Sequence, residues 1–449
     1  MPQQPSADVQ EFLDAHPVSG FQWLVFVLCF CVVLLDGFDT AAISYIAPRL
    51  VAEWGIERPA LGPVLSAALF GLAFGALAAG PLADRFGRKR VLVGSVLLIG
   101  ATSLASSFAG SLGALTAWRF ATGLGLGAAM PNAVTLMSEY CPAARRATLT
   151  NAMFCGFPLG AAFGGFLAAW MIPAFGWRSV LLLGGVVPLA LGLLLVLRLP
   201  ESVRYMVAKR HAPERIRAVL RRIGPEAAEA ADFTLAEATP AQRGGIRLVL
   251  SRPYALGSAM LWLTYFMGLV IFYALLNWMP ILFGDAGLDP RTAALIAALF
   301  PLGGFGAILC GWLMDRMNPN LVIAAGFALT SLAVWAIGQA AGNLSLLMAA
   351  VFVAGTLMNT AQSSLPALAA GFYPTQGRAT GVAWMLGLGR FGGIAGSFLV
   401  AELARRQMGF GAIFTVMAIP GLVAAAALLV KQAARPGEAA PRAEAVLGH

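Results

Sequence analysis

Apolar runs of about twenty residues recur along the whole chain, and each is long enough to cross roughly 30 Å of hydrocarbon as a helix. Only 11% of the 449 residues are charged, whereas a soluble domain typically carries about 25%. The sequence therefore predicts an all-α polytopic membrane protein. Twelve spans are expected, at 20–46, 61–82, 89–109, 112–138, 147–171, 176–198, 254–283, 291–314, 320–341, 343–370, 378–403 and 410–432.

The cations lie mainly in alternate connections between these spans, and this pattern orients the chain. They follow the second, fourth and sixth spans, as Arg85, Arg88, Lys89, Arg90, Arg145, Arg146, Arg204, Lys209, Arg210, Arg215, Arg217, Arg221 and Arg222. By the positive-inside rule, both termini are predicted to be cytoplasmic. The net charge of +9 is therefore explained by the cations of the predicted cytoplasmic connections. A continuous basic face or stacking aromatics, which nucleic-acid binding would need, are not visible. The first twenty residues lack a basic start, so they are not expected to be a cleaved signal peptide.

Cysteine and histidine usage argues against metal, disulfide and acid–base sites in the membrane. The five cysteines include no CxxC pair, so packing as small residues is the preferred interpretation. The three histidines, His16, His211 and His449, lie outside the predicted spans. The sequence shows no buried pair of nucleophile and base and no set of metal ligands, so an enzyme is not expected.

The chain contains two copies of one pattern. GPLADRFGRKR after the second span corresponds to GWLMDRMNPN after the eighth, with Asp84 matching Asp315 at an offset of 231 residues. CPAARRATLTN before the fifth span corresponds to YPTQGRATGVA before the eleventh, with Arg146 matching Arg378 at an offset of 232. Because two independent stretches agree on the spacing, one half of the chain is interpreted as a copy of the other.

Two copies joined by a polar segment resemble the transporters of the major facilitator superfamily. GPLADRFGRKR matches the superfamily signature Gly-x-x-x-Asp-Arg-x-Gly-Arg-Lys at every fixed position. The resemblance implies the major facilitator fold, with twelve transmembrane helices in two pseudo-symmetric six-helix halves, and alternating access. The implied boundaries are 1–198 for the N-terminal half, 199–252 for a cytoplasmic linker, and 253–449 for the C-terminal half with its tail.

The signature also implies a cytoplasmic latch between the halves. Asp84 would lie near the positive N-terminal end of the eleventh helix, and the neighbouring cations would pair with acids such as Glu139. The alternative is that these cations only set the topology. The candidate latch residues are Asp84, Arg85, Gly87, Arg88, Glu139, Arg146, Asp315, Arg316 and Arg378. Since the mirrored MDRMNP lacks the later cations, the second latch is expected to be weaker.

Several stretches together resemble the aromatic acid:proton symporters of this superfamily, above all LLDGFDTAAI in the first span, with LPESVRYMV, LLNWMPIL and RATGVAWMLGLGRFGG. The resemblance implies uptake of an aromatic carboxylate such as 4-hydroxybenzoate, protocatechuate or benzoate, with the proton as coupling ion and no cofactor. It implies a monomer in a bacterial inner membrane. The implied functional residues are Asp36, Asp39, Asp315, Arg378 and Arg390. Relatives can have a His where this chain has Asn320, which argues against a titrating group there.

Four ionisable side chains lie deep in the predicted spans: Asp36, Asp39, Arg119 and Arg390. Each costs about 2.5–3.5 kcal/mol there, so we expect them to face a wet cavity or one another. Asp36 and Asp39 are three residues apart and share a helical face. Both cannot be ionised cheaply, so at least one is expected to exchange a proton. At 1.5 Å per residue, Asp39 and Arg119 lie at similar depth and can meet.

Arg390 lies near the predicted midplane, where a guanidinium can bind a substrate carboxylate through two hydrogen bonds. The alternative is a structural pair with one of the aspartates. Asp39 is the preferred proton site and Asp36 the second, although a helix bend or a pair with Arg119 would also explain Asp39. Arg119 is a candidate of the substrate site, but support of Asp39 is its preferred role.

The rest of a binding site would need an aromatic slot and polar groups. The candidates are Phe38, Tyr273, Asn277, Asn359, Gln362 and Trp384, and packing or interhelical hydrogen bonds would explain each of them alone. The alternatives in function are transport of another organic anion and proton-driven efflux. The glycine–proline pattern of the superfamily's antiporters is absent from CGFPLGAAFGG in the fifth span, which favours uptake. The linker is too short for the signalling domain of a receptor.

Overall fold

Long apolar helices make up most of the protein in a computed structural model, which describes residues 6–228, 232–235, 245–306, 316–373 and 375–433. Among these residues, eleven helical segments are long and apolar enough to cross a membrane. They correspond to eleven of the twelve predicted spans. The remaining one, at 291–314, begins as the shorter helix α13 and continues into 307–315, outside the described residues. The helical membrane fold predicted from the sequence is confirmed.

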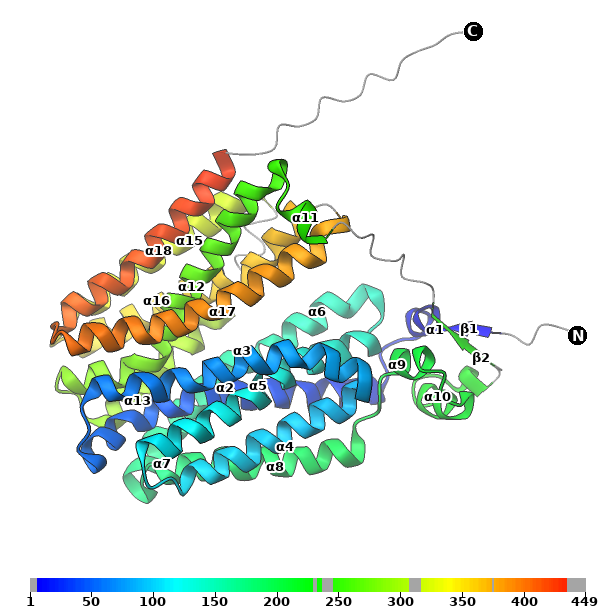
Figure 1. The fold of residues 1–449 in the computed structure, drawn as a ribbon, viewed down its shortest axis with the longest axis horizontal. Helices are drawn as coiled ribbons and strands as arrows, with labels where there is room; N and C mark the ends of the chain where they lie inside the picture. Colours follow the sequence, from blue (N-terminus) through cyan, green and yellow to red (C-terminus); the bar gives the residue numbers. More distant parts are fainter. Residues whose placement is uncertain (1–5, 229–231, 236–244, 307–315, 374, 434–449) are drawn as a thin grey trace, which may run out of the picture.

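The helices form two groups (Figure 1). The first contains α2 (Gly20–Trp54), α3 (Leu61–Phe86), α4 (Arg88–Ser107), α5 (Leu112–Tyr140), α6 (Ala143–Phe154), α7 (Gly156–Phe175) and α8 (Arg178–Arg198). The second contains α12 (Arg252–Asp285), α13 (Pro290–Leu302), α15 (Pro319–Gln339), α16 (Leu344–Phe372), α17 (Thr375–Arg405) and α18 (Phe410–Ala433). The predicted fifth span is thus built from two helices, α6 and α7, which meet at Cys155.

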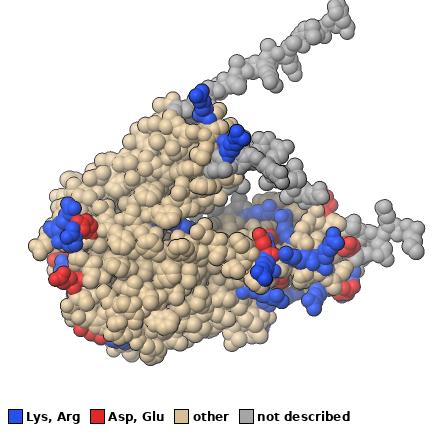
Figure 2. Space-filling view, viewed as in Figure 1, with Lys and Arg blue, Asp and Glu red and all other residues tan. Residues whose placement is uncertain are grey.

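The two groups meet at one end of the molecule and diverge at the other (Figure 1). We call the end at which α2 and α12 begin the linker end, and the end at which they finish the far end. Packing between the groups joins α7 to α13, α3 to α17 and α2 to α12. At the far end, Arg58 of the short helix η1 (Arg58–Ala60) forms an ion pair with Asp285 of α12. Figure 2 shows the surface hollowed between the groups on the side toward α9 and α10.

Glycines let neighbouring helices approach backbone to backbone. A Cβ added to Gly37 of α2 would overlap the backbone of Phe157 in α7, and one added to Gly160 of α7 would overlap the backbone of Leu34 in α2. Small residues at such positions are what close packing of helices in a membrane requires. This packing fixes the rotation of α2, and with it the direction of Asp36 and Asp39.

A small folded unit covers the linker end of the first group. It combines β1 (Ser6–Asp8) and α1 (Val9–Ala15) with α9 (Val203–Ala208), α10 (Pro213–Leu220), the short helix η2 (Pro225–Ala228) and β2 (Asp232–Thr234). The short helix α11 (Gly245–Val249) packs instead on α17 and α12 of the second group. β1 and β2 pair in parallel, with Ala7 opposite Phe233. Apolar side chains from both segments, including Leu13 and Leu220, are buried together. The sequence did not predict this pairing of the N-terminal segment with the linker.

Charged side chains gather at the two ends of the molecule, and the surface between them is almost free of charge in the view of Figure 2. The wide uncharged band carries exposed apolar residues such as Phe74, Leu77, Phe163 and Leu193. A soluble protein rarely exposes so large a contiguous apolar surface. The band is therefore the surface that faces lipid.

Candidate functional site

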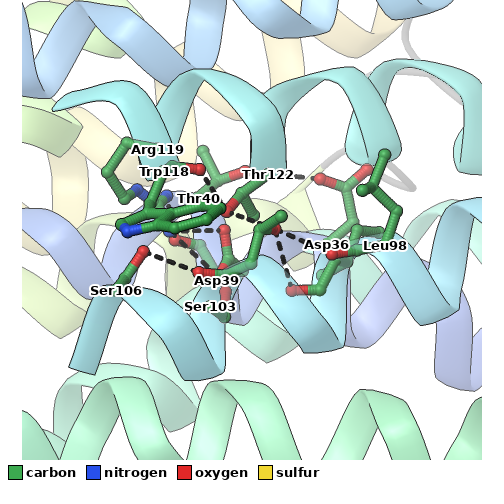
Figure 3. A network of polar contacts seen from close by, with 11 residues as sticks. Asp36, Asp39, Thr40, Leu98, Ser103, Ser106, Trp118, Arg119 and Thr122 are labelled. Atoms are coloured by element: carbon green, nitrogen blue, oxygen red, sulfur yellow. Dashed lines mark hydrogen bonds and ion pairs between the residues drawn. The ribbon is translucent and has the colours of Figure 1, made fainter. Parts of the chain in front are cut away.

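Asp39 of α2 lies at the centre of a buried polar network between α2, α4 and α5 (Figure 3). Nη1 of Arg119 lies 2.9 Å from Oδ2 of Asp39 and donates to Oδ1 at 3.1 Å. Nη2 of the same guanidinium donates to the backbone carbonyl of Asp39 at 3.0 Å. The contact between Asp39 and Arg119 that their depth predicted is present, and it removes both charges from solvent.

A second side-chain partner of Asp39 comes from α4 and was not predicted. Ser103 donates from Oγ to Oδ1 of Asp39 at 2.6 Å, and its side chain is fully buried. It belongs to the run ATSLASS, whose hydroxyls Thr102, Ser103 and Ser106 lie on the buried side of α4. Thr102 also contacts Thr122 of α5 at 2.9 Å. The hydroxyls of one turn of α4 thus line the contact with α2 and α5; their spacing in the sequence was the available signal.

Asp36 lies one turn before Asp39 on α2 and is 2% exposed. Thr40 donates a hydrogen bond to Oδ1 of Asp36 at 3.3 Å, which is longer than the hydrogen bonds to Asp39, so the carboxyl group of Asp36 is held less firmly than that of Asp39. Asp39, Arg390 and Tyr273 all lie within electrostatic range of it. Asp36 therefore links the network of the first helix group to residues of the second.

Arg390 reaches from α17 toward the first group. Its Nη1 lies 3.5 Å from the carbonyl oxygen of Leu72 in α3, and the side chain is partly buried. Among the described residues, no carboxylate lies within ion-pair distance of this guanidinium. The ring of Tyr265 packs beside the neighbouring Gly389, and Tyr265 and Tyr273 lie within electrostatic range of Arg390. The structure thus brings a cation and two phenol rings to the boundary between the helix groups.

Three other candidates are engaged in packing between helices. Asn277 donates to Ser397 at 2.8 Å, Asn359 donates to the carbonyl groups of Phe300 and Gly355, and the ring of Phe38 lies against glycines of α7 and α8. Phe38 therefore points into the first helix group. In this structure the side chains of these three residues therefore serve packing and hydrogen bonding between helices, which was the alternative to substrate contact.

Gln362 and Trp384 contact residues of α12. Gln362 donates weakly to the backbone carbonyl of Tyr265, at 3.4 Å. Trp384 stacks on Trp262 with ring centroids 5.8 Å apart, and 46% of Trp384 is exposed. Both lie on the α12 side of the second group, and only Gln362 touches a residue in range of Arg390.

The signature after α3 forms contacts within the first helix group. Asp84 pairs with Arg88 at 3.0 Å and its side chain is 73% exposed. Arg88 also lies 3.7 Å from Glu139 and over the ring of Tyr205. Gly87 has φ of +97°, a backbone conformation that favours glycine, and a Cβ there would overlap the carboxylate of Glu201. In this conformation Asp84 is turned to solvent and to its own helix group.

The other latch candidates are placed as follows. The backbone carbonyl of Arg85 accepts a hydrogen bond from Tyr205, at 3.1 Å. Arg146 donates to the carbonyl of Ser138 and to Gln10 of α1, which ties α6 to the N-terminal helix. Arg316 is exposed at the linker end of the second group. Asp315 and the side chain of Arg378 lie outside the described residues.

A buried cation that the sequence analysis did not single out lies at the linker end of the second group. Lys431 of α18 is 6% exposed, donates to Oδ1 of Asn320 at 2.7 Å and lies over the ring of Phe372 at 4.6 Å. Asn320 in turn donates to Gln432 at 2.8 Å. The amide of Asn320 thus accepts from an ammonium and donates to an amide, which a neutral side chain of this kind does without titrating.

No group of three or more His, Cys, Asp or Glu side chains that could hold a metal ion occurs among the described residues. The chemistry available at the centre of the molecule is therefore that of two carboxyl groups, two guanidinium groups, hydroxyls and phenol rings. Such a set can exchange protons and bind an anion.

Comparison with known proteins places this geometry in context. A family model described as the Major Facilitator Superfamily matches residues 29–337 and 282–447. The 4-hydroxybenzoate transporter PcaK of Pseudomonas aeruginosa is 51% identical over 434 residues, covering 96% of this chain and 97% of that protein. The gallate transporter of Pseudomonas putida is 47% identical over 429 residues, covering 95% of this chain and 96% of that protein. The solved structure of the xylose transporter XylE from E. coli in an inward open conformation matches with a TM-score of 0.71 at 18% identity, covering 91% of this chain and 96% of that one, a likeness of fold.

Proposed function

The chain belongs to the major facilitator superfamily of membrane transporters, and on that premise we propose that it imports an aromatic carboxylate together with protons. The substrate class is supported by relatives named as 4-hydroxybenzoate and gallate transporters, which match nearly the whole chain at 51% and 47% identity. The observation that carries the proposal is the buried contact of Asp39 with Arg119 close to Asp36, which faces a partly buried Arg390 without a carboxylate partner among the described residues.

Asp39 is the proposed proton carrier, and Arg119 is the group that compensates its charge. When Asp39 takes a proton from water, its carboxyl group becomes neutral and its attraction to the guanidinium weakens. When it returns the proton to water on the other side, the carboxylate regains its ion pair with Arg119. A buried ion pair of this kind makes the protonation state of one residue control the contact between α2 and α5. Asp36 is the second proposed proton site, because a change in its charge alters its electrostatic interaction with Arg390 of the second helix group.

Arg390 is the proposed anchor for the substrate carboxylate. A guanidinium presents two parallel N–H donors that match the two oxygens of a carboxylate. The rings of Tyr265 and Tyr273, near Arg390, offer apolar and aromatic surface for the substrate ring. Asp36 within electrostatic range of Arg390 competes with the substrate for that cation when ionised, and ceases to compete when protonated. Proton uptake and anion binding would thereby favour each other.

Alternating access supplies the transport step in this proposal. The units 1–198 and 253–449 rock about the central site, and the linker 199–252 connects them. The linker end, where the cations concentrate, faces the cytoplasm of a bacterial cell, with both termini on that side. Because the helix groups diverge at the linker end, the conformation described here is one from which cargo would leave inward. The protein acts as a monomer.

Uptake by purified protein in vesicles tests the proposal. Proteoliposomes without ATP and with an alkaline interior are given radiolabelled 4-hydroxybenzoate, and a protonophore is added to a parallel sample. The expected result is accumulation that the protonophore abolishes and that Asp39→Asn prevents. Accumulation that persists without a proton gradient would overturn proton-coupled import. So would efflux of preloaded substrate driven by the entry of protons into the vesicles.

A further inference from the structure

Ser103 makes the shortest hydrogen bond to Asp39, and neither the sequence motifs nor the family signature includes it. Its Oγ lies 2.6 Å from Oδ1 of Asp39, and the side chain is completely buried. It comes from α4, a helix that supplies no charged group to the centre. The bond therefore adds a neutral partner to a carboxyl group whose other side-chain partner is a cation (Figure 3).

A hydroxyl differs from a guanidinium in being able to donate or to accept a hydrogen bond. Arg119 has donors but no acceptor, so it cannot accept the O–H of Asp39 when that residue is protonated. Ser103 can donate to the carboxylate and, after rotation of its O–H, accept from the protonated acid. It is thus a partner that remains satisfied in both charge states of a buried acid, where an unpaired polar group is costly.

We propose that Ser103 is a positioning residue for proton coupling, which holds the Asp39 carboxyl group in place in both of its protonation states and sets the pH at which it exchanges its proton. This inference rests on the proposed function of Asp39. A merely structural serine would fill space in α4, and its loss would leave the pH dependence of transport unchanged.

The other groups facing Asp39 come from each neighbouring helix. Arg119 of α5 touches it, and Asp36 lies one turn away on α2. Arg390 of α17 and Tyr273 of α12 lie within electrostatic range of Asp36. The neighbouring helix α8 presents Gly184 toward Asp39 and α7 carries no ionisable side chain. Among the described residues, Ser103 is therefore the one hydroxyl that donates a hydrogen bond to this carboxylate.

Removing the hydroxyl should affect the ionised form more than the protonated form, because a hydrogen bond to a charged group is stronger than one between neutral groups. Ser103→Ala should therefore raise the apparent proton affinity of the transporter by about three- to tenfold. The profile of proton-driven uptake against pH should move to alkaline values by roughly half a pH unit to one unit.

The test compares three variants in proteoliposomes. Ser103→Ala removes the hydroxyl, and Ser103→Thr restores it. Ser95→Ala is the matched control, because Ser95 also lies buried on α4 but donates to the carbonyl of Val91, at 2.7 Å. Uptake of 4-hydroxybenzoate is measured from pH 5 to 8, and exchange of internal for external substrate is measured at equal pH on both sides.

We expect the alkaline shift in Ser103→Ala, a profile close to that of the wild type in Ser103→Thr and Ser95→Ala, and exchange retained in all three. If Ser103→Ala does not fold, Ser103→Cys, with its weaker donor, should give a smaller shift in the same direction. A profile of Ser103→Ala or Ser103→Cys that coincides with that of Ser95→Ala would overturn the inference alone. Wild-type uptake that does not depend on a proton gradient would overturn the proposed function, and the inference with it.

Discussion

Arg119 and Asp39 form an ion pair in which the two side chains are 0% and 2% exposed. The guanidinium uses one nitrogen for both carboxylate oxygens and another for the backbone carbonyl of Asp39. It therefore holds the helix backbone of α2 as well as its charge. A pair of this kind is costly to break, because the remaining charge has no water to solvate it.

Loss of one partner of this pair should destabilise the protein strongly. We expect Arg119→Leu to lower the free energy of unfolding by about 3–5 kcal/mol, since Asp39 would be left buried and unpaired. The double variant with Asp39→Asn and Arg119→Gln should recover much of that loss, because it removes both charges. Thermal unfolding in detergent, followed by tryptophan fluorescence, gives the comparison.

The matched control for this prediction is Arg178→Gln. Arg178 pairs with Glu53 at the far end, and the two side chains are 44% and 47% exposed. An exposed pair contributes only about 0–1 kcal/mol. If Arg119→Leu unfolded at the temperature of Arg178→Gln, the pair at the centre would not stabilise the bundle as we infer.

Replacement of Arg390 should weaken substrate binding without large effects on folding, because this side chain is only partly buried and forms one long hydrogen bond. Removal of charge-assisted hydrogen bonds of about 1.5–3 kcal/mol predicts a loss of affinity of about 10- to 100-fold in Arg390→Gln. Arg390→Lys should lie between this variant and the wild type, since an ammonium cannot bind a carboxylate through a planar fork.

Binding of 4-hydroxybenzoate by calorimetry at one fixed pH measures these differences. Arg406→Gln is the control, since Arg406 is an exposed cation just after the far end of α17 that pairs with Glu402 of that helix. Equal affinity of Arg390→Gln and Arg406→Gln would show that the substrate carboxylate binds elsewhere.

The sequence predicted the spans and the contact of Asp39 with Arg119 because both depend on lengths that can be counted in residues along a helix. Hydrophobic length sets the spans, and the rise per residue sets the depth of each charge. The partner of Asp39 on α4 could not be predicted in this way. Hydroxyl residues are common in membrane helices, and the choice of Ser103 depends on how α4 is rotated against α2.

Rotation of α2 also explains why the ring of Phe38 packs within the first helix group, as the packing alternative had it. It is adjacent to Asp39 in the sequence, but neighbouring residues of a helix point about 100° apart. Gly164 and Gly184 leave room for its ring inside the first helix group. The burial of Lys431 likewise depends on Asn320 and Phe372, which are distant from it in the sequence.

The contact between the N-terminal segment and the linker should depend on pH through His16. Its Nδ1 lies 2.7 Å from the carbonyl of Phe12 and its Nε2 lies 3.0 Å from Glu226, and both neighbours raise the pKa of His16 above its usual 6.5. The stabilisation that follows is fully present below pH 6.5 and is lost as the pH rises through the raised pKa. The pKa of Glu226 is lowered, chiefly by its own backbone and then by His16, so its contribution is lost only as the pH falls below about 4.5.

Hydrogen–deuterium exchange of Val9–Ala15, corrected for intrinsic exchange, tests this window. Protection of this helix should be high at pH 5.5 and should decrease toward pH 8.5 in the wild type. His16→Gln should show weaker protection with little change over the same range, whereas His211→Gln should behave as the wild type. A decrease with pH in His16→Gln as large as that in the wild type would assign the effect to another group.

The ion pair of Arg58 with Asp285 should restrain the far end of the transporter. It joins η1 of the first helix group to α12 of the second, at the end where the groups meet. Under alternating access the two ends open in turn, so this pair must break before the far end can open. An exposed pair contributes up to about 1 kcal/mol, which corresponds to a shift of about fivefold in the ratio of the two conformations.

Spin labels on Ala52→Cys and Ala286→Cys, in a background without the native cysteines, report the distance across the far end. Arg58→Glu should increase the population with the longer distance, because it places two acids together. The exchanged variant, Arg58→Glu with Asp285→Arg, should restore the original distribution, and Arg178→Glu should leave it unchanged because its pair lies within one helix group. An exchanged variant that stays as open as Arg58→Glu would mean that the attraction between these two charges does not hold the far end closed.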